Sequence, residues 1–213
     1  MKVLSGEFVT SVAAGGVLPA ETHAVVALVG RSNVGKSTLV NTLARQRIAR
    51  AGATPGTTRL LNVYRLRIST AGRGSIGISL IDLPGYGYAR GTRQAGQGFE
   101  ALTTEFFTSM VRSAPAARGG GPWLAGAVLV VDARHPGLPA DKSAHAWLAA
   151  RACPVVVVAT KGDRLSRSAC RRSVSDHEAA LECPVLPVSR RADGDGADRL
   201  WRQLAELAAG DAA

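Results

Sequence analysis

The chain has 213 residues, of which 46% are hydrophobic, so it can form one domain, or at most two, around a substantial core. Its formal net charge of +10 favours a polyanionic partner, although a basic surface can also serve solubility alone. Three cysteines lack metal-ligand spacing, the N-terminus lacks a signal-peptide pattern, and no apolar run approaches the ~20 residues of a membrane span. We therefore expect a cytoplasmic protein with reduced thiols and no membrane partner.

The first half of the chain alternates apolar runs with helical patterns. The run at residues 24–29 predicts a buried strand, followed by a glycine-rich turn and a helix over residues 37–45. Alternating runs at residues 60–68 and 76–82 predict two strands joined by a glycine-containing turn. A helical pattern covers residues 99–111, with aromatic and aliphatic residues at helical spacing.

The second half repeats this alternation. Its strands are continuous apolar runs, which are typical of strands buried on both faces of a parallel sheet. We expect strands at residues 125–133, 154–161 and 184–189 and helices at residues 140–151, 167–181 and 195–209. This order predicts an α/β fold with a mostly parallel sheet and helices on both faces. We expect one domain over residues 23–210, with residues 1–22 as an extension packed on its edge.

The sequence GRSNVGKS directly follows the first strand and fits the phosphate-loop pattern G-x-x-x-x-G-K-[ST]. Its glycines let backbone N–H groups turn towards phosphate oxygens, and the following helix directs the positive end of its dipole at them. We expect Lys36 to reach the β- and γ-phosphates and the Ser37 hydroxyl to bind Mg²⁺. An ordinary strand-to-helix turn is the alternative. The expected phosphate-binding residues are Gly30, Arg31, Ser32, Asn33, Val34, Gly35, Lys36 and Ser37.

A second motif, TKGD at residues 160–163, lies at the end of a predicted strand. A carboxylate at Asp163 can accept hydrogen bonds from N1 and N2 of guanine, a donor pair that adenine lacks, while the Lys161 stem packs over the base. The motif is weak by itself, because a capped strand end has the same composition. Together with the phosphate loop it favours guanine, and an ATP-dependent P-loop enzyme is kept as an alternative.

Six motifs occur in order along the chain: FVTS…LP, GRSNVGKSTLVNTL, ATPGTTRLLNVY, DLPGYGYAR, VVDAR followed by D…WL, and TKGDRL. In order and spacing they resemble the TRAFAC-class GTPases, and specifically the EngB/YsxC family of bacterial ribosome-assembly GTPases. The resemblance covers about residues 6–190. It implies a Ras-like P-loop fold with a six-stranded, mostly parallel sheet, GTP or GDP as the ligand, Mg²⁺ as the cofactor, and the large (50S) ribosomal subunit or its rRNA as the partner.

The same resemblance assigns individual roles. Thr58, in switch I, is the second protein ligand to Mg²⁺ beside Ser37, although the adjacent Thr57 leaves a register ambiguity that only the family match resolves. Asp82 holds Mg²⁺ through water, and the Gly85 N–H meets the γ-phosphate, so that Lys36, Thr58 and Gly85 form the catalytic set. Beyond the phosphate loop, the implied nucleotide-binding residues are Gly56, Thr57, Thr58, Arg59, Leu60, Asp82, Leu83, Pro84, Gly85, Thr160, Lys161, Gly162, Asp163, Val188, Ser189 and Arg190.

Hydrolysis is expected to be slow. Ras-like enzymes use a glutamine after the DxxG glycine to orient water, and this chain has Tyr86 there, a position where the resemblance implies a residue that points away from the γ-phosphate. A partner or K⁺, with Asn33 as its ligand, would accelerate the reaction. The resemblance also implies a role in cell division and septation, and we expect a monomer. A nucleotide-gated rRNA- or ribosome-binding module with negligible turnover is a further alternative.

Overall fold

The computed structural model describes residues 2–13, 15–19, 24–49, 60–70, 74–86, 102–110, 121–189 and 195–210. Its strands are β1 (Lys2–Ala13), β2 (Ala24–Gly30), β3 (Leu60–Thr70), β4 (Gly74–Asp82), β5 (Trp123–Asp132), β6 (Val155–Thr160) and β7 (Val185–Pro187). Its helices are α1 (Lys36–Ala44), α3 (Pro139–Ala149), α4 (Arg167–Leu181) and α5 (Asp195–Ala209), with a short 3₁₀ helix at Gly162–Arg164. Residues 102–110 are also helical.

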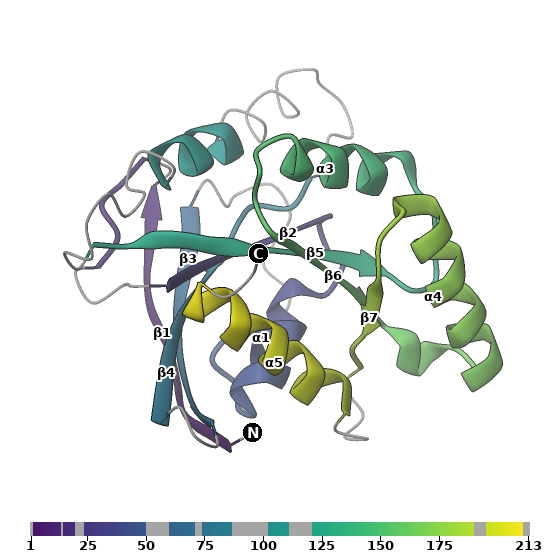
Figure 1. Ribbon diagram of the computed structural model, residues 1–213, viewed down its shortest axis with the longest axis horizontal. Helices are drawn as coiled ribbons and strands as arrows, with labels where there is room; N and C mark the ends of the chain where they lie inside the picture. Colours follow the sequence, from purple (N-terminus) through teal and green to yellow (C-terminus); the bar gives the residue numbers. More distant parts are fainter. Residues whose placement is uncertain are drawn as a thin grey trace.

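The seven strands form one sheet in the order β1-β3-β4-β2-β5-β6-β7, with helices on both faces (Figure 1). The pairs β4-β2, β2-β5, β5-β6 and β6-β7 are parallel, whereas β1-β3 and β3-β4 are antiparallel. The structure therefore confirms the expected α/β fold with a mostly parallel sheet. No helix in the described part of the chain is long and apolar enough to cross a membrane.

The strand count differs from the six strands expected, because residues 2–13 form an additional edge strand on β3. The pairing has register shifts between Val3 and Ser5 and between Phe8 and Thr10, so exposed and half-buried side chains do not alternate regularly along β1. The period of two that reveals a strand in a sequence is therefore lost here. The Phe8 ring packs edge-on against Tyr64 of β3, with ring centroids 5.7 Å apart.

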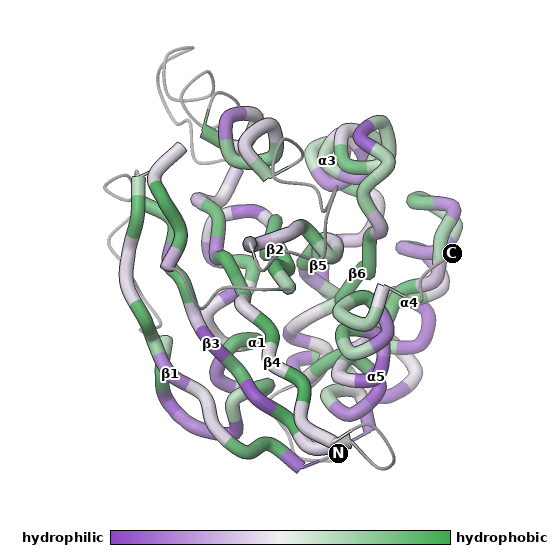
Figure 2. The backbone as a smooth tube through the Cα atoms, turned by 60° about the vertical axis from the view of Figure 1, so that its left-hand side comes forward, coloured by the Kyte–Doolittle hydropathy of each residue, from purple (hydrophilic) through white to green (hydrophobic). Residues whose placement is uncertain are grey.

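Two hydrophobic clusters attach the helices to the sheet, one on each face. On one face α1 and α5 contribute Leu39, Leu43 and Trp201, which are almost completely buried. On the other face the helix at residues 102–110 contributes Phe107, and α3 contributes Leu148. Because β2 and β5 are covered on both sides, most of their residues are hydrophobic, and much of the tube in the centre of Figure 2 is green.

The carboxyl ends of the parallel strands meet at one edge of the sheet. The pairing aligns Leu28 of β2 with Asp82 of β4, and Asp132 of β5 with Thr160 of β6. Gly30 ends β2 in the same region. In an open parallel sheet this edge is where loops converge and ligands bind, so the predicted phosphate and base motifs share one edge of the molecule.

Candidate nucleotide-binding site

The phosphate loop turns sharply between β2 and α1. Asn33 has φ 60° and Gly35 has φ 120°, and the second value is one that residues with a side chain rarely adopt. A Cβ at Gly35 would also lie 3.3 Å from the Thr160 hydroxyl oxygen. The loop therefore depends on Gly35, and it leads directly into the first turn of α1, where backbone N–H groups have no intrahelical partners.

Lys36 and Asp82 meet at the start of this helix. The Lys36 ammonium donates to the Gly30 carbonyl at 3.2 Å and lies 3.9 Å from Asp82 Oδ1, and both side chains are buried. Burial lowers the pKa of Lys36, and the neighbouring Asp82 opposes this effect. Burial likewise raises the pKa of Asp82 to about 6, against the pull of Lys36. Both charges are held away from water in an arrangement that an anionic ligand and a cation would complete.

The DxxG segment, Asp82 to Gly85, lies against the phosphate loop. Leu83 donates its N–H to the Leu28 carbonyl at 3.1 Å, which extends the pairing of β4 with β2. The Ser32 hydroxyl donates to the Gly85 carbonyl at 3.2 Å, and a Cβ at Gly85 would lie 2.5 Å from the Ser32 nitrogen. Only glycine permits this approach, so the contact with the loop explains why position 85 is a glycine.

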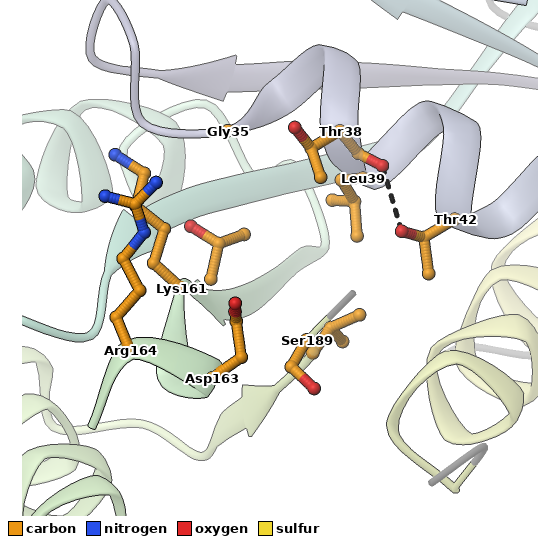
Figure 3. A pocket seen from close by; sticks show the side chains of 10 residues that line it. Gly35, Thr38, Leu39, Thr42, Lys161, Asp163, Arg164 and Ser189 are labelled. Atoms are coloured by element: carbon orange, nitrogen blue, oxygen red, sulfur yellow. Dashed lines mark hydrogen bonds between the residues drawn. The ribbon is translucent and has the colours of Figure 1, made fainter. Parts of the chain in front are cut away.

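A pocket opens beside the TKGD motif, between α1 and the turn after β6 (Figure 3). The Asp163 carboxylate points into it, with Lys161 on one side and Ser189 on the other. The lining residues are Gly35, Thr38, Leu39, Thr42, Thr160, Lys161, Asp163, Arg164, Val188 and Ser189. Carboxylate, hydroxyl and aliphatic groups around one hollow suit a flat base with N–H donors on its edge.

Side-chain hydrogen bonds tie the TKGD motif to the phosphate loop. The Thr160 hydroxyl contacts the Val34 carbonyl at 2.7 Å and the Val131 carbonyl at 3.0 Å, and it can donate to one of them at a time. The Lys161 ammonium donates to the Asn33 carbonyl at 2.6 Å. The loop for phosphates and the pocket for a base therefore form one continuous site.

Asp132, at the end of β5, supports this arrangement. Its carboxylate accepts hydrogen bonds from the Lys161 ammonium at 2.9 Å and from the Arg134 guanidinium at 2.7 and 2.9 Å. Burial alone would raise the pKa of Asp132, but these hydrogen bonds outweigh it and hold the pKa well below its usual range. The carboxylate is thus ionised at neutral pH and fixes the Lys161 side chain.

The structure also positions Tyr86, which follows the DxxG glycine. Its hydroxyl donates to Asp141 Oδ1 of α3 at 2.8 Å, and the ring lies in the hydrophobic cluster on that face of the sheet. Burial and the neighbouring Asp141 raise the pKa of Tyr86 far above its usual range. The phenol is therefore neutral and is engaged with a helix outside the phosphate loop.

Most of the predicted site residues converge, but five lie outside the described residues: Gly56, Thr57, Thr58, Arg59 and Arg190. Leu60, the last residue of the predicted switch I segment, begins β3 and is exposed. Four pocket residues were not predicted from the sequence: Thr38, Leu39, Thr42 and Arg164. Thr38 and Thr42 lie one helical turn apart directly after the phosphate motif, a spacing that could have indicated them.

The residues near Lys36 fit a bound Mg²⁺ ion. Asp82 Oδ1 is buried and has no hydrogen-bond partner among the described residues. Ser37 follows Lys36 in the first turn of α1 and is partly accessible. A carboxylate and a hydroxyl are oxygen donors, which Mg²⁺ prefers, and Mg²⁺ completes its shell with water and phosphate oxygens.

Comparison with known proteins agrees with this geometry. Residues 25–161 match the family described as "50S ribosome-binding GTPase". The "Probable GTP-binding protein EngB" of Pelotomaculum thermopropionicum is 39% identical over 170 residues, which cover 79% of this chain and 76% of that protein. The protein of the same name from Anaeromyxobacter sp. (strain K) is 36% identical over 215 residues, covering 98% and 94% of the two chains.

Solved structures show the same fold. The "Crystal structure of a probable GTP-binding protein engB" matches with a TM-score of 0.61 at 23% identity, over 87% of this chain and 99% of that one. The FeoB G-domain from Methanococcus jannaschii matches with a TM-score of 0.54 at 18% identity, over 89% and 99% of the two chains. The resemblance inferred from the motifs is thus confirmed, and the chain belongs to the EngB family of GTP-binding proteins, within the 50S ribosome-binding GTPases.

Proposed function

We propose that this protein binds GTP and GDP at the described edge of the sheet, hydrolyses GTP slowly with Mg²⁺, and acts as a nucleotide switch in assembly of the large ribosomal subunit. The observation that carries the proposal is the continuity of the site. Thr160 and Lys161, from the base motif, contact the carbonyls of Val34 and Asn33 in the phosphate loop. One ligand with a phosphate chain and a base can therefore occupy both halves.

The phosphate end is proposed to work as follows. Residues 30–37 surround the phosphates, Lys36 neutralises the β- and γ-oxygens, and Ser37 and Thr58 bind Mg²⁺, with Asp82 acting through water. Bound Mg²⁺ would offset charge on the phosphate oxygens. The Gly85 N–H would meet the γ-phosphate. Residues 56–60 would form switch I, which the γ-phosphate and Mg²⁺ order and which hydrolysis releases.

The base end is proposed to select guanine. Asp163 would accept from N1 and N2 of the base, Lys161 would lie along its plane, and the backbone at residues 188–190 would contact its carbonyl oxygen. The Asp163 carboxylate points into the pocket, which supports this role (Figure 3).

Slow hydrolysis follows from the absence of a glutamine after Gly85. Tyr86 replaces it, and its hydroxyl is engaged with Asp141, 2.8 Å away. We propose that a partner, or K⁺ near Asn33, supplies the missing assistance. Asn33 is exposed at the surface of the loop with a left-handed backbone, which leaves its side chain accessible.

The proposed partner is the large ribosomal subunit. The names of the matched family and relatives support it, and the net charge of +10 suits an rRNA surface. A role in cell division and septation, a cytoplasmic location and a monomeric state belong to the same proposal. So does a single G domain over residues 23–210 that carries residues 1–22 as an extension.

Base selection can be tested with Asp163→Asn. Removing the carboxylate should weaken GTP and GDP binding about a hundredfold, because two charge-assisted hydrogen bonds are lost. The amide can donate to the 2-oxo group of xanthine, so xanthosine diphosphate should bind the variant more tightly than the wild type. Equilibrium binding of fluorescent nucleotides measures both effects.

Competition experiments provide the control for this test. Unlabelled ATP should not displace labelled GDP from the wild type, whereas displacement at comparable concentrations would favour an ATP-dependent enzyme. GTP turnover with and without 50S particles, in KCl and in NaCl, separates an enzyme from a binding module. Turnover that stays negligible under all four conditions would contradict the proposed hydrolysis.

A further inference from the structure

Asp141 is not one of the predicted nucleotide-binding residues, but it contacts two segments of the proposed site. This residue is in the first turn of α3, and its side chain is 1% exposed. The Tyr86 hydroxyl donates to its Oδ1 atom at 2.8 Å, and the Arg31 Nε atom lies 3.4 Å from the same oxygen. Arg31 belongs to the phosphate loop and Tyr86 directly follows Gly85. One carboxylate on a helix therefore contacts both segments.

The two segments are also joined through their backbones. The Ser32 N–H donates to the Tyr86 carbonyl at 3.0 Å, and Arg31 and Tyr86 form an isolated parallel β-bridge. Gly85 is held so close to Ser32 that a Cβ would lie 2.5 Å from the Ser32 nitrogen. The position of Gly85 relative to the phosphate loop thus depends on contacts made by its neighbour Tyr86.

Stability alone does not account for a charged group at position 141. The Asp141 side chain is buried, and its Oδ2 atom has no hydrogen-bond partner among the described residues. Burial raises the pKa of Asp141, against the effects of Tyr86 and Arg31, so ionising it here is costly. Apolar groups that replace buried ion pairs are often neutral or stabilising. The carboxylate therefore points to a role in positioning.

We propose that Asp141 is a positioning residue for γ-phosphate recognition: through the Tyr86 hydroxyl it holds Gly85 against the phosphate loop, and so increases the affinity for GTP relative to GDP. This inference rests on the proposed function, in which the Gly85 N–H meets the γ-phosphate. GDP has no γ-phosphate, so its binding does not require Gly85 to be fixed. Without the hydrogen bond, only a fraction of molecules would present Gly85 correctly, and the affinity for GTP would fall to that fraction of its full value.

Three variants test the inference: Tyr86→Phe, Asp141→Ala and Asp141→Asn. Dissociation constants for GDP and for a non-hydrolysable GTP analogue are measured with Mg²⁺ by equilibrium titration. Tyr86→Phe and Asp141→Ala should each weaken binding of the analogue about tenfold and change GDP binding by less than about twofold. Asp141→Asn should lie between these variants and the wild type, because its amide oxygen can still accept from the tyrosine.

The double variant Tyr86→Phe/Asp141→Ala makes the test independent of simple damage to the fold. If the two side chains act through one hydrogen bond, the double variant should lose no more analogue affinity than either single variant. Phe107→Leu is the matched control, because Phe107 belongs to the same hydrophobic cluster and contacts the Trp147 ring of α3. It should lower the melting temperature and leave the ratio of the two dissociation constants unchanged.

The outcomes distinguish this inference from the proposed function. The positioning role of Asp141 would be overturned if the variants left the ratio of the two dissociation constants unchanged, or if the losses of analogue affinity added up in the double variant. If the wild type binds both nucleotides, the proposed function stays intact in either case. Failure of the wild type to bind either nucleotide would instead contradict the proposed function itself.

Discussion

At the scale of single residues, the site depends on buried carboxylates that contact charged side chains. Asp132 is the clearest case, because its side chain is 4% exposed and it contacts the charged groups of Arg134 and Lys161. Lys161 in turn contacts the phosphate loop at the Asn33 carbonyl. Asp132 is not itself a predicted ligand-binding residue, yet its carboxylate fixes the direction of the Lys161 side chain.

Asp132→Asn should therefore weaken GTP and GDP binding together, by about tenfold, since the lysine is less firmly held. The ratio of the two affinities should not change, because Lys161 belongs to the base end of the site. Titration with both nucleotides checks this. Asp198→Asn removes the exposed contact with Arg45 and serves as the control. Unchanged nucleotide affinity in the Asp132 variant would contradict the proposed support of Lys161.

The same substitution has a defined pH dependence. The pKa of Asp132 is lower in the folded protein than its unfolded value of 3.8, so its contribution to stability is fully present above that value and is lost only as the pH falls further. We expect Asp132→Asn to lower the free energy of unfolding by about 1 to 2 kcal/mol at pH 7, because its partners are partly solvated. The difference in unfolding free energy between the variant and the wild type should shrink below about pH 4. Urea unfolding at several pH values measures it, and a difference that grows in acid would contradict the assignment.

At the scale of elements, the sequence predicted the parts of the fold that follow a regular pattern. The parallel strands are continuous apolar runs, and the phosphate motif marks the turn into α1, so β2, β5 and β6 agree with their expected positions to within a few residues. The edge strand β1 was not predicted, because its bulges break the alternation of side chains. Tertiary pairing with β3 determines its structure, and no local pattern reveals that.

For the candidate site, motifs predicted the groups proposed to contact the ligand but not the contacts that hold those groups in place. Lys161 and Gly85 were predicted because they belong to short, specific patterns. Asp132 and Asp141 belong to the motifs VVDAR and D…WL, but the motifs did not reveal their partners, because only the folded structure brings the two carboxylates against Lys161 and Tyr86. Contacts between residues far apart in the chain have no signature within one sequence.

Removing residues 1–13 tests the role of β1 as a separate element. The truncation exposes the edge of β3 and uncovers Tyr64, so the melting temperature should fall by about 5 to 10 °C. GDP affinity should change by less than about twofold, because no residue of β1 lines the described pocket. Phe8→Ala, which removes only the ring contact with Tyr64, should have a smaller effect on melting. Loss of nucleotide binding in a folded truncated protein would contradict this separation.

At the scale of the whole molecule, the net charge of +10 attracts any large polyanion. Two arginines form ion pairs within the protein: Arg65 of β3 lies 3.3 Å from Glu7, and Arg45, at the end of α1, lies 3.1 Å from Asp198. Arg47 and Arg67 are exposed. Arg50 and Arg59, which the sequence also places near switch I, lie outside the described residues. The positive surface is therefore spread over several elements.

Binding to 50S particles should accordingly depend on salt. If several phosphate contacts form, the affinity measured by co-sedimentation should fall by at least about tenfold between 50 and 200 mM KCl, because the release of counterions on binding becomes less favourable as the salt concentration rises. Association should be stronger with a GTP analogue than with GDP. A flat salt dependence would argue for a protein surface as the ribosomal contact, and equal binding with both nucleotides would contradict the switch.

The hydrogen bond between Thr160 and the Val34 carbonyl spans 126 residues of sequence. During synthesis, the phosphate motif therefore emerges from the ribosome long before the strand that supports it, and a nascent chain that ends before β6 lacks the predicted base motif TKGD. We therefore expect full nucleotide affinity only after β6 has joined the sheet. Because a ligand that binds only the folded state stabilises it, guanine nucleotide would then act on the last steps of folding, making the cellular nucleotide supply part of how this protein matures.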